Sequence, residues 1–279
     1  MKTIGMLFIL LITAQVAGQD FTGLATYKTD MKIELKMDST QVGDDHMRLI
    51  KEQIRFANQK EFRLSFNKTE SNWKEEEQLD KPSNGGGGIQ IQVVGIGGGA
   101  DGLLYKNTKD KTRLESTDAF GKLFLISGEL EPYEWEMTSE TKQIGKYTCY
   151  KAIAKREVTE MHISDVNGEK EEKEEKKMQT TTAWYTPEIP VNHGPENYWG
   201  LPGLILEVGS GNRIMICTRV ILNPKEEKVT IEIPSKGKEV TDTEYEALMK
   251  AHTDKMLKMY GGGKKKGQKE STMQIKIQG

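Results

Sequence analysis

The segment from Ala183 to Val208, AWYTPEIPVNHGPENYWGLPGLILEV, constrains the fold of this chain more than any other stretch. Both ends of the segment are rich in β-forming residues, whereas its middle holds four prolines and three glycines. Because Pro187 and Pro190 have no backbone N–H to donate, a strand that enters this segment must lie at a sheet edge or leave its sheet there. The segment therefore predicts a crossover between two strands.

Two turns are predicted inside this crossover. Residues His193–Pro195 have the composition of a turn, and Leu201–Leu204 fits a type II turn, in which proline sets φ and the following glycine allows φ > 0. Trp184, Tyr198 and Trp199 flank these turns and are candidates for a ligand pocket or a docking surface. The alternative, which we favour, is that they form a structural plug over one end of a curved sheet.

Alternating apolar and polar residues predict β-strands along much of the chain. The predicted strands are 23–37, 61–67, 103–105, 122–126, 134–137, 146–153, 180–185, 204–208, 213–222 and 228–233. The GSGN tetrapeptide before Arg213 predicts a tight hairpin. Within the strand that follows, Ile214, Ile216, Val220 and Leu222 are assigned to one face.

Two helices are predicted among these strands. The first covers VGDDHMRLIKEQIRFANQ, residues 42–59, where apolar residues recur at helical spacing. The second begins at a capping box of Thr241 and Glu244 and ends at Gly261. The chain is therefore predicted to be mainly β (α+β): a curved antiparallel sheet or half-barrel, with an N-terminal-half helix and a C-terminal helix packed on it.

The first 18 residues have the layout of a secretory signal peptide. Lys2 precedes a short apolar run from Ile4 to Ile12, and small residues follow, with cleavage expected after Gly18. The apolar run is too short to cross a membrane. We therefore expect export to the periplasm or the outer membrane, with an extracellular location as the alternative.

The rest of the chain is expected to hold a single domain over residues 19–260. Two flexible insertions interrupt it, a glycine-rich one at 82–100 and a charged one at 165–178, which is interpreted as the tip of a long hairpin. A flexible basic tail at 261–279 ends in a short strand. The glycine-rich insertion contains a GxGxxA pattern, but strand-like residues rather than a helix follow it, so no dinucleotide site is predicted.

Few residues in this sequence indicate catalysis or metal binding. Cys149 and Cys217 are the two cysteines; they can form a disulfide in an oxidising compartment or remain buried free thiols. The four histidines lack metal-site spacing, and His193, beside Glu188 and Glu196, is interpreted as a turn residue rather than a metal ligand. No serine lies in a nucleophile elbow. We therefore predict no catalytic residue, no metal and no cofactor.

The hexapeptide GLPGLI at Gly200–Ile205 resembles the signature of the GLPGLI family of exported Bacteroidetes proteins. Other blocks resemble that family in the same order: FRLSFNKTES from Phe62, LYKN from Leu104 and WEMTSETKQIGKYTCYKA from Trp135. The motif residues that carry the resemblance in the crossover are Trp184, Pro187, Pro190, Gly194, Pro195, Gly200, Leu201, Pro202, Gly203, Leu204 and Ile205. The resemblance implies a cell-envelope protein whose molecular role is not established.

The expected function is a noncatalytic envelope protein that binds or carries an apolar ligand, in a half-barrel similar to those of periplasmic lipid carriers. The first alternative is an accessory subunit of an outer-membrane transporter, which is suggested by the family's envelope setting. An unrecognised hydrolase is the second. The net charge of −2 gives no indication of a nucleic-acid partner. The lining of any cavity beneath the crossover would discriminate among these hypotheses.

Overall fold

The computed structural model describes residues 21–31, 60–76, 102–166, 169–260 and 276–277. These residues form strands and one helix, α2 (Asp242–Tyr260). The strands are β1 (Gly23–Met31), β2 (Glu61–Phe66), β3 (Glu70–Glu75), β4 (Leu103–Asn107), β5 (Thr112–Ala119), β6 (Lys122–Glu129), β7 (Glu136–Ile144), β8 (Tyr147–Val166), β9 (Glu169–Thr186), β10 (Leu204–Ser210), β11 (Arg213–Leu222), β12 (Lys238–Thr241) and β13 (Lys276–Ile277).

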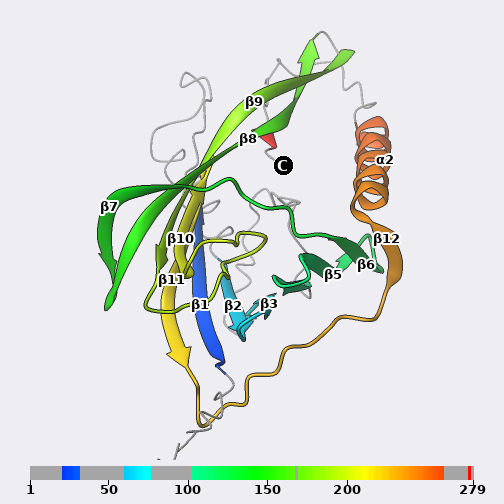
Figure 1. Ribbon diagram of the computed structural model, residues 1–279. Coiled ribbons are helices and arrows are strands. Elements are labelled where there is room, and N and C mark those ends of the chain that lie inside the picture. Colours follow the sequence, from blue (N-terminus) through cyan, green and yellow to red (C-terminus); the bar gives the residue numbers. More distant parts are fainter. Residues whose placement is uncertain (1–20, 32–59, 77–101, 167–168, 261–275, 278–279) are drawn as a thin grey trace, which may run out of the picture.

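All of these strands belong to one open, mainly antiparallel sheet of 13 strands, shown in Figure 1. Its order is β12-β6-β5-β4-β3-β2-β1-β11-β10-β9-β8-β13, with β7 paired to β8 beside this path. Among the described strands, β12 and β6 form the parallel pair. The predicted mainly β class is confirmed.

The main core lies on one face of this sheet, which we call the core face. Leu64 and Phe66 of β2, Trp73 of β3 and Tyr27 of β1 are buried there. Phe62 stacks on the Trp73 ring at 4.8 Å, and the Tyr27 hydroxyl donates to the Ile205 carbonyl at 2.6 Å. The same cluster includes Ile189, Val191 and Leu201 from the segment between β9 and β10, so this segment covers the core face.

Helix α2 packs on the other end of the sheet. It begins at the predicted capping box: the Thr241 N–H donates to Glu244 Oε2 at 2.8 Å, and the Glu244 N–H donates to Thr241 Oγ1 at 3.3 Å. Tyr245 and Met249 pack on a small cluster from β5, β6 and β12, and His252 stacks on Phe120. The predicted C-terminal helix is therefore confirmed, whereas the predicted helix at 42–59 lies outside the described residues.

The strand predicted at 228–233 is wrong. These residues run extended beside β3 without forming a ladder, between Pro224 and Pro234. The Asn72 side chain takes the place of a ladder partner: its Nδ2 donates to the Glu232 carbonyl at 2.8 Å, and its Oδ1 accepts from the Glu232 N–H at 2.6 Å. An alternating pattern alone did not reveal that a side-chain amide satisfies this backbone.

The face predicted for β11 is wrong in its first half. Met215 is 3% exposed in the core, whereas Ile216 is 39% exposed. The pairing with β1 skips Thr218, which marks a β-bulge, and the Thr218 hydroxyl donates to the Thr26 carbonyl at 3.2 Å. Because one extra residue shifts the alternation, Val220 and Leu222 return to the core cluster as predicted.

The predicted long hairpin is formed by β8 and β9, which pair from Tyr150↔Tyr185 to Val166↔Glu169. Most of the charged insertion predicted at 165–178 is regular strand within β9, rather than the tip of the hairpin. Since β10 pairs with β9 only at its Thr181–Thr186 end, the remainder of the hairpin extends past the sheet, as Figure 1 shows. The predicted terminal strand is β13, which pairs with β8 at Met161 and His162. The insertion at 82–100 lies outside the described residues.

Candidate functional site

Residues 187–203, which we call the crossover, connect β9 to β10 across the core face. The chain leaves the sheet after Thr186, directly before Pro187, as predicted from the prolines. The crossover then folds back on its own start: the Leu204 N–H donates to the Ile189 carbonyl at 3.0 Å, and the Gly200 N–H donates to the Asn192 carbonyl at 3.0 Å. These bonds fix a compact loop rather than a free connection.

The glycines of the crossover have roles different from those predicted. Gly203 does not have a positive φ, so the predicted type II turn is wrong, and the positive value of 94° belongs to Gly200. Gly203 is needed for close approach instead, because a Cβ there would collide with the Thr186 carbonyl group. A Cβ at Gly194 would similarly lie 2.8 Å from the Tyr198 carbonyl oxygen.

Lys106 of β4 holds the crossover in place through hydrogen bonds to its backbone. Its side chain is fully buried, and its ammonium donates to the carbonyl oxygens of Gly194, at 2.7 Å, and Glu196. Burial lowers the pKa of Lys106 to about 7, against the opposing attraction of the Glu196 carboxylate. Sequence reasoning missed this residue, although alternation from Leu104 places Lys106 on the core face.

His193 anchors the crossover at a second point. Its ring is buried, and Nε2 lies 3.1 Å from the Asn67 carbonyl oxygen, so Nε2 carries the proton and donates. Burial and the nearby Lys106 charge lower the pKa of His193 to about 3, which keeps the ring neutral. The interpretation of His193 as a turn residue is therefore wrong, since the residue forms a bridge with Trp199 and lies in the core.

The carboxylates next to His193 in the sequence are bound elsewhere. Glu188 accepts from the Thr148 N–H at 2.8 Å, and Glu196 pairs with Arg213 at 2.6 Å. Within the part of the chain that the structure describes, no three His, Cys, Asp or Glu side chains come together as a metal site.

Tyr198 and Trp199 belong to an aromatic brace between the crossover and the segment that precedes β7. The Trp199 indole N–H donates to the Glu131 carbonyl at 3.0 Å, and the Trp135 indole N–H donates to the Trp199 carbonyl at 2.9 Å. The Tyr133 ring stacks on Trp135 at 5.0 Å and lies 5.3 Å from the Tyr198 ring. The indole N–H groups of Trp135 and Trp199 therefore both have backbone carbonyl partners, and the brace joins the crossover to the segment before β7.

Trp184 lies apart from the other two candidate aromatics. Ala183, its neighbour on β9, is buried on the core face, and successive strand residues point to opposite faces. The Lys142 ammonium lies 4.4 Å above the Trp184 ring and pairs with Glu207 at 2.6 Å. Trp184 thus contacts Lys142, whereas Tyr198 and Trp199 contact the segment before β7; Trp184 and Tyr198 both pack against the main core cluster.

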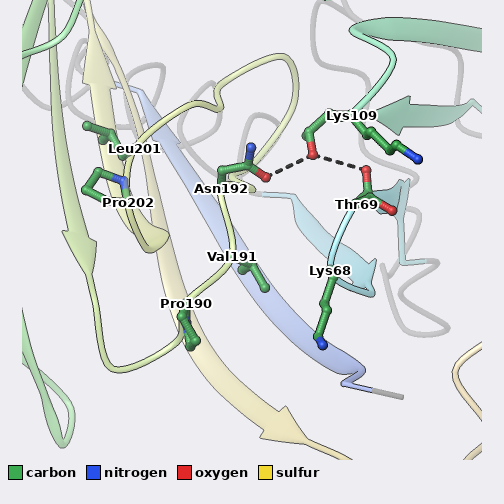
Figure 2. Close-up of a pocket in the computed structure, with 9 residues that line it drawn as sticks. Lys68, Thr69, Lys109, Pro190, Val191, Asn192, Leu201 and Pro202 are labelled. Atoms are coloured by element: carbon green, nitrogen blue, oxygen red, sulfur yellow. Dashed lines mark hydrogen bonds between the residues drawn. The ribbon is translucent and has the colours of Figure 1, made fainter. Parts of the chain in front are cut away.

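A pocket of about 380 Å³ lies between the crossover and two turns of the sheet (Figure 2). We call it the turn-end pocket. Its lining residues are Lys68, Thr69, Thr108, Lys109, Pro190, Val191, Asn192, Leu201 and Pro202. The Thr108 hydroxyl joins the walls, since it lies 2.9 Å from Asn192 Oδ1 and 3.1 Å from the Thr69 carbonyl oxygen.

The two turns that line this pocket are stabilised by the same pattern of hydrogen bonds from an asparagine side chain to the backbone. Asn67 Oδ1 accepts from the N–H groups of Thr69 at 2.9 Å and Glu70 at 2.7 Å. Asn107 Oδ1 accepts from the N–H groups of Lys109 and Asp110, both at 3.0 Å. Asparagine side chains that bind the backbone ahead of them stabilise tight turns, so both turn walls of the pocket are preorganised.

Cys149 and Cys217 are both buried free thiols in the structure. Burial raises the pKa of Cys149 to about 11 and that of Cys217 to about 12, so neither is a reactive thiolate at neutral pH. This arrangement corresponds to the free-thiol alternative. Pairing in an oxidising compartment stays a prediction.

Residues 135–207 match the model of a family described as "Protein of unknown function (Porph_ging)". The match runs from Trp135 of the aromatic brace to Glu207 of β10, and so includes the whole crossover. No curated protein matches the sequence.

The solved structures that the chain resembles include two of PNGF-II, in space groups C2 and P21. The C2 structure is 15% identical, with a TM-score of 0.47, and the P21 structure is 16% identical, with a TM-score of 0.46. The resemblance covers 82% and 81% of this chain but 32% and 33% of those chains, so this chain spans about a third of their length. Likeness this distant carries no conclusion about activity.

Within the described ranges, no helix has both the length and the apolar character needed to cross a membrane.

Proposed function

We propose that this chain is an exported, noncatalytic envelope protein of the GLPGLI type that binds the apolar part of a ligand in the turn-end pocket. The observation that carries the proposal is that the crossover itself forms one wall, with Pro190, Val191, Leu201 and Pro202. The volume of about 380 Å³ falls within the range of small-molecule sites, about 300–1,000 Å³.

The fixed geometry of the walls supports a binding role. Lys106 and His193 hold the crossover, and the asparagine-capped turns hold the opposite wall. A preorganised pocket loses little conformational entropy when a ligand enters. We further propose that the sheet forms the half-barrel expected from the sequence, with the crossover as its plug.

A hydrolase is less well supported by this geometry. Ser71, Lys106 and His193 are the buried groups that a hydrolytic site would recruit, yet each is fully buried. A nucleophile and its base must reach the substrate to within hydrogen-bond distance. The described lining of the turn-end pocket contains no His, Cys, Asp or Glu.

Binding of an uncharged fluorescent probe, N-phenylnaphthylamine, to the full chain tests the pocket. Thr69→Phe places a ring in the pocket, and we expect it to weaken binding by at least about tenfold. Thr112→Phe is the matched control, since Thr112 is exposed and outside the lining. Equal binding by the wild type and Thr69→Phe, or no binding at all, contradicts the proposal.

Export is tested separately by fractionating cells that express the full chain. We expect a mature protein in the envelope or medium whose N-terminal residue is Gln19. An intact chain with Met1 in the cytoplasm is the opposite result.

A role as an accessory subunit is a second candidate, favoured by the hairpin of β8 and β9 that extends beyond its sheet partner β10. Strand edges that lack a neighbour are surfaces for other chains. Crosslinking in intact envelopes, with and without this hairpin, tests the role. A membrane partner recovered only by the complete chain supports it, whereas recovery by neither excludes it.

A further inference from the structure

The turn-end pocket has a positively charged rim. Lys68 lies in the turn after β2, Lys109 lies in the turn after β4, and of the described residues that line the pocket none is acidic. The whole chain has 40 basic and 42 acidic residues, so a rim with bases alone does not reflect average composition.

The acidic residues nearest these lysines in the sequence already have partners. Glu70 accepts from the Tyr105 hydroxyl at 2.6 Å and from Asn67 Nδ2 at 2.9 Å, and the Tyr105 bond is the main cause of its lowered pKa. Asp110 accepts from Asn107 Nδ2 at 2.8 Å. Within the described part of the chain, neither the Lys68 nor the Lys109 ammonium forms an ion pair.

A second pocket, of about 520 Å³, differs from the turn-end pocket in the charges of its lining residues. It lies over β2 and β3 and is lined by both acids and bases, among them Arg63 and Glu76. Arg63 pairs with Glu76 at 2.5 Å and with Glu227 at 2.7 Å. An anion entering that pocket would have to displace these carboxylates, whereas the turn-end pocket requires no such exchange.

We propose that the turn-end pocket takes the anionic end of an amphiphile, a carboxylate or a phosphate, at the rim that carries Lys68 and Lys109. The adjoining carbons would lie against Pro190 and Pro202, which are exposed on the crossover wall. Asn192 Oδ1 accepts from Thr108, which leaves the Asn192 amide N–H groups as further donors. The inference rests on the proposed function and specifies its ligand class. A pocket near the lower end of the usual size range suits one end of a molecule rather than a whole lipid.

Titration calorimetry of the full chain with decanoate, decyl phosphate and decanol tests the inference, because these probes share one alkyl chain and differ in the head. We expect the anionic probes to bind about tenfold more tightly than decanol, because they gain contacts with two exposed lysine ammonium groups. Added salt should reduce this preference. A preference for one anionic probe over the other identifies the head as carboxylate or phosphate.

The paired variant Lys68→Gln/Lys109→Gln should bind decanoate and decyl phosphate as weakly as the wild type binds decanol. Lys111→Gln is the matched control: Lys111 is exposed in the same turn but does not line the pocket. It should keep the preference for anions. Thermal unfolding confirms that each variant folds, which is expected because both rim lysines are exposed.

Equal binding of decanol and the anionic probes by the wild type overturns the inference but leaves the proposed pocket standing. A preference for anions that persists in the paired variant also overturns the inference and leaves the proposed pocket standing. Failure of all three probes to bind overturns both the inference and the proposed function.

Discussion

At the scale of single residues, Lys106 shows how a costly group can hold a loop in place. An ammonium buried without a carboxylate partner loses much of its hydration, yet the Lys106 group satisfies two backbone carbonyls that the crossover would otherwise bury unpaired. A neutral amine still has two N–H donors, so both bonds survive when the proton leaves. The crossover therefore depends on the presence of this side chain more than on its charge.

Lys106→Met should destabilise the protein by about 2–4 kcal/mol at neutral pH, because the carbonyls of Gly194 and Glu196 lose their donors. Urea unfolding followed by tryptophan fluorescence measures the change. Lys74→Met is the control, since Lys74 is exposed on neighbouring β3. A loss no greater than that of the control contradicts the anchoring role.

The same residue predicts a pH dependence. Its folded pKa of about 7 lies below the ordinary value of 10.5, so between these values the unfolded chain binds more protons and stability rises with pH. Above about pH 9 the raised pKa values of Cys149 and Cys217 act in the opposite direction. We expect the unfolding free energy to increase between pH 7 and 9, by up to about 1 kcal/mol per pH unit, and Lys106→Met to remove the increase. Parallel curves for the two proteins would disprove this.

His193 acts in the acidic range. Its folded pKa of about 3 lies below its ordinary value of 6.5, so the unfolded chain gains a proton first, and stability is lost as pH falls below 6.5. His193→Gln keeps a donor for the Asn67 carbonyl but does not titrate. Between pH 6.5 and 5, above the usual carboxylate range, the variant should lose less stability than the wild type. An equal loss in both proteins would mean that His193 is not the group responsible.

At the scale of elements, the crossover depends on a close approach between its two ends. The backbone at Gly203 lies against that of Thr186 and Pro187, and a methyl group at Gly203 would prevent this contact. Gly203→Ala places its Cβ against the Thr186 carbonyl and the Pro187 nitrogen, and backbone atoms cannot move aside as a flexible side chain does. We expect a loss of about 3 kcal/mol or more in unfolding free energy, measured in urea. Gly209→Ala is the control, because its nearest contact would be an ordinary 3.6 Å to Ile214 Cγ1. Similar losses at both positions would show that the steric explanation is wrong.

Elements with one apolar face were predictable, whereas elements buried through polar contacts were not. β2 has alternating apolar residues that a period of two detects, and β10 begins with a continuous apolar run, which is typical of a buried strand. β3 was missed because Ser71 and Asn72 are buried polar residues, and Asn72 binds a segment 160 positions away. β5 was missed because Arg113, a charged residue of this strand, is largely buried and forms an ion pair with Asp242 of α2. Such burial depends on contacts distant in sequence.

At the scale of the whole molecule, only half of the candidate site was accessible from the sequence. The crossover wall was predicted from its prolines, and its aromatic residues were noted. The opposite wall comes from Lys68 and Thr69 in one turn and Thr108 and Lys109 in another, and the sheet brings these turns to the same end. Each of these turns begins at an asparagine, Asn67 or Asn107, and this shared pattern could have indicated two related turns. It could not have indicated that both turns face the crossover.

The outer part of the β8–β9 hairpin, residues 158–177, extends beyond the sheet and contributes no residue to the turn-end pocket. We call this part the arm. Arg156 still belongs to the sheet region, because its guanidinium donates to the Pro132 carbonyl at 2.9 Å and lies 4.0 Å from the Tyr133 ring. Beyond it, β9 pairs with β8 alone, and the Lys176–Glu157 ion pair is highly exposed. Exposed ion pairs contribute little to stability.

Replacing residues 158–177 with Asn-Gly should therefore leave the fold intact. The new turn joins Glu157 to Met178, which are register partners, and Asn-Gly is the preferred two-residue hairpin turn. We expect a Tm within a few degrees of the wild type and unchanged binding of N-phenylnaphthylamine, because every residue that lines the pocket is retained. The replacement also removes the Met161 and His162 pairing of β13, which joins only two residues to β8. A Tm lower by tens of degrees would show instead that the arm stabilises the sheet, and its role as a separate docking element would then be untenable.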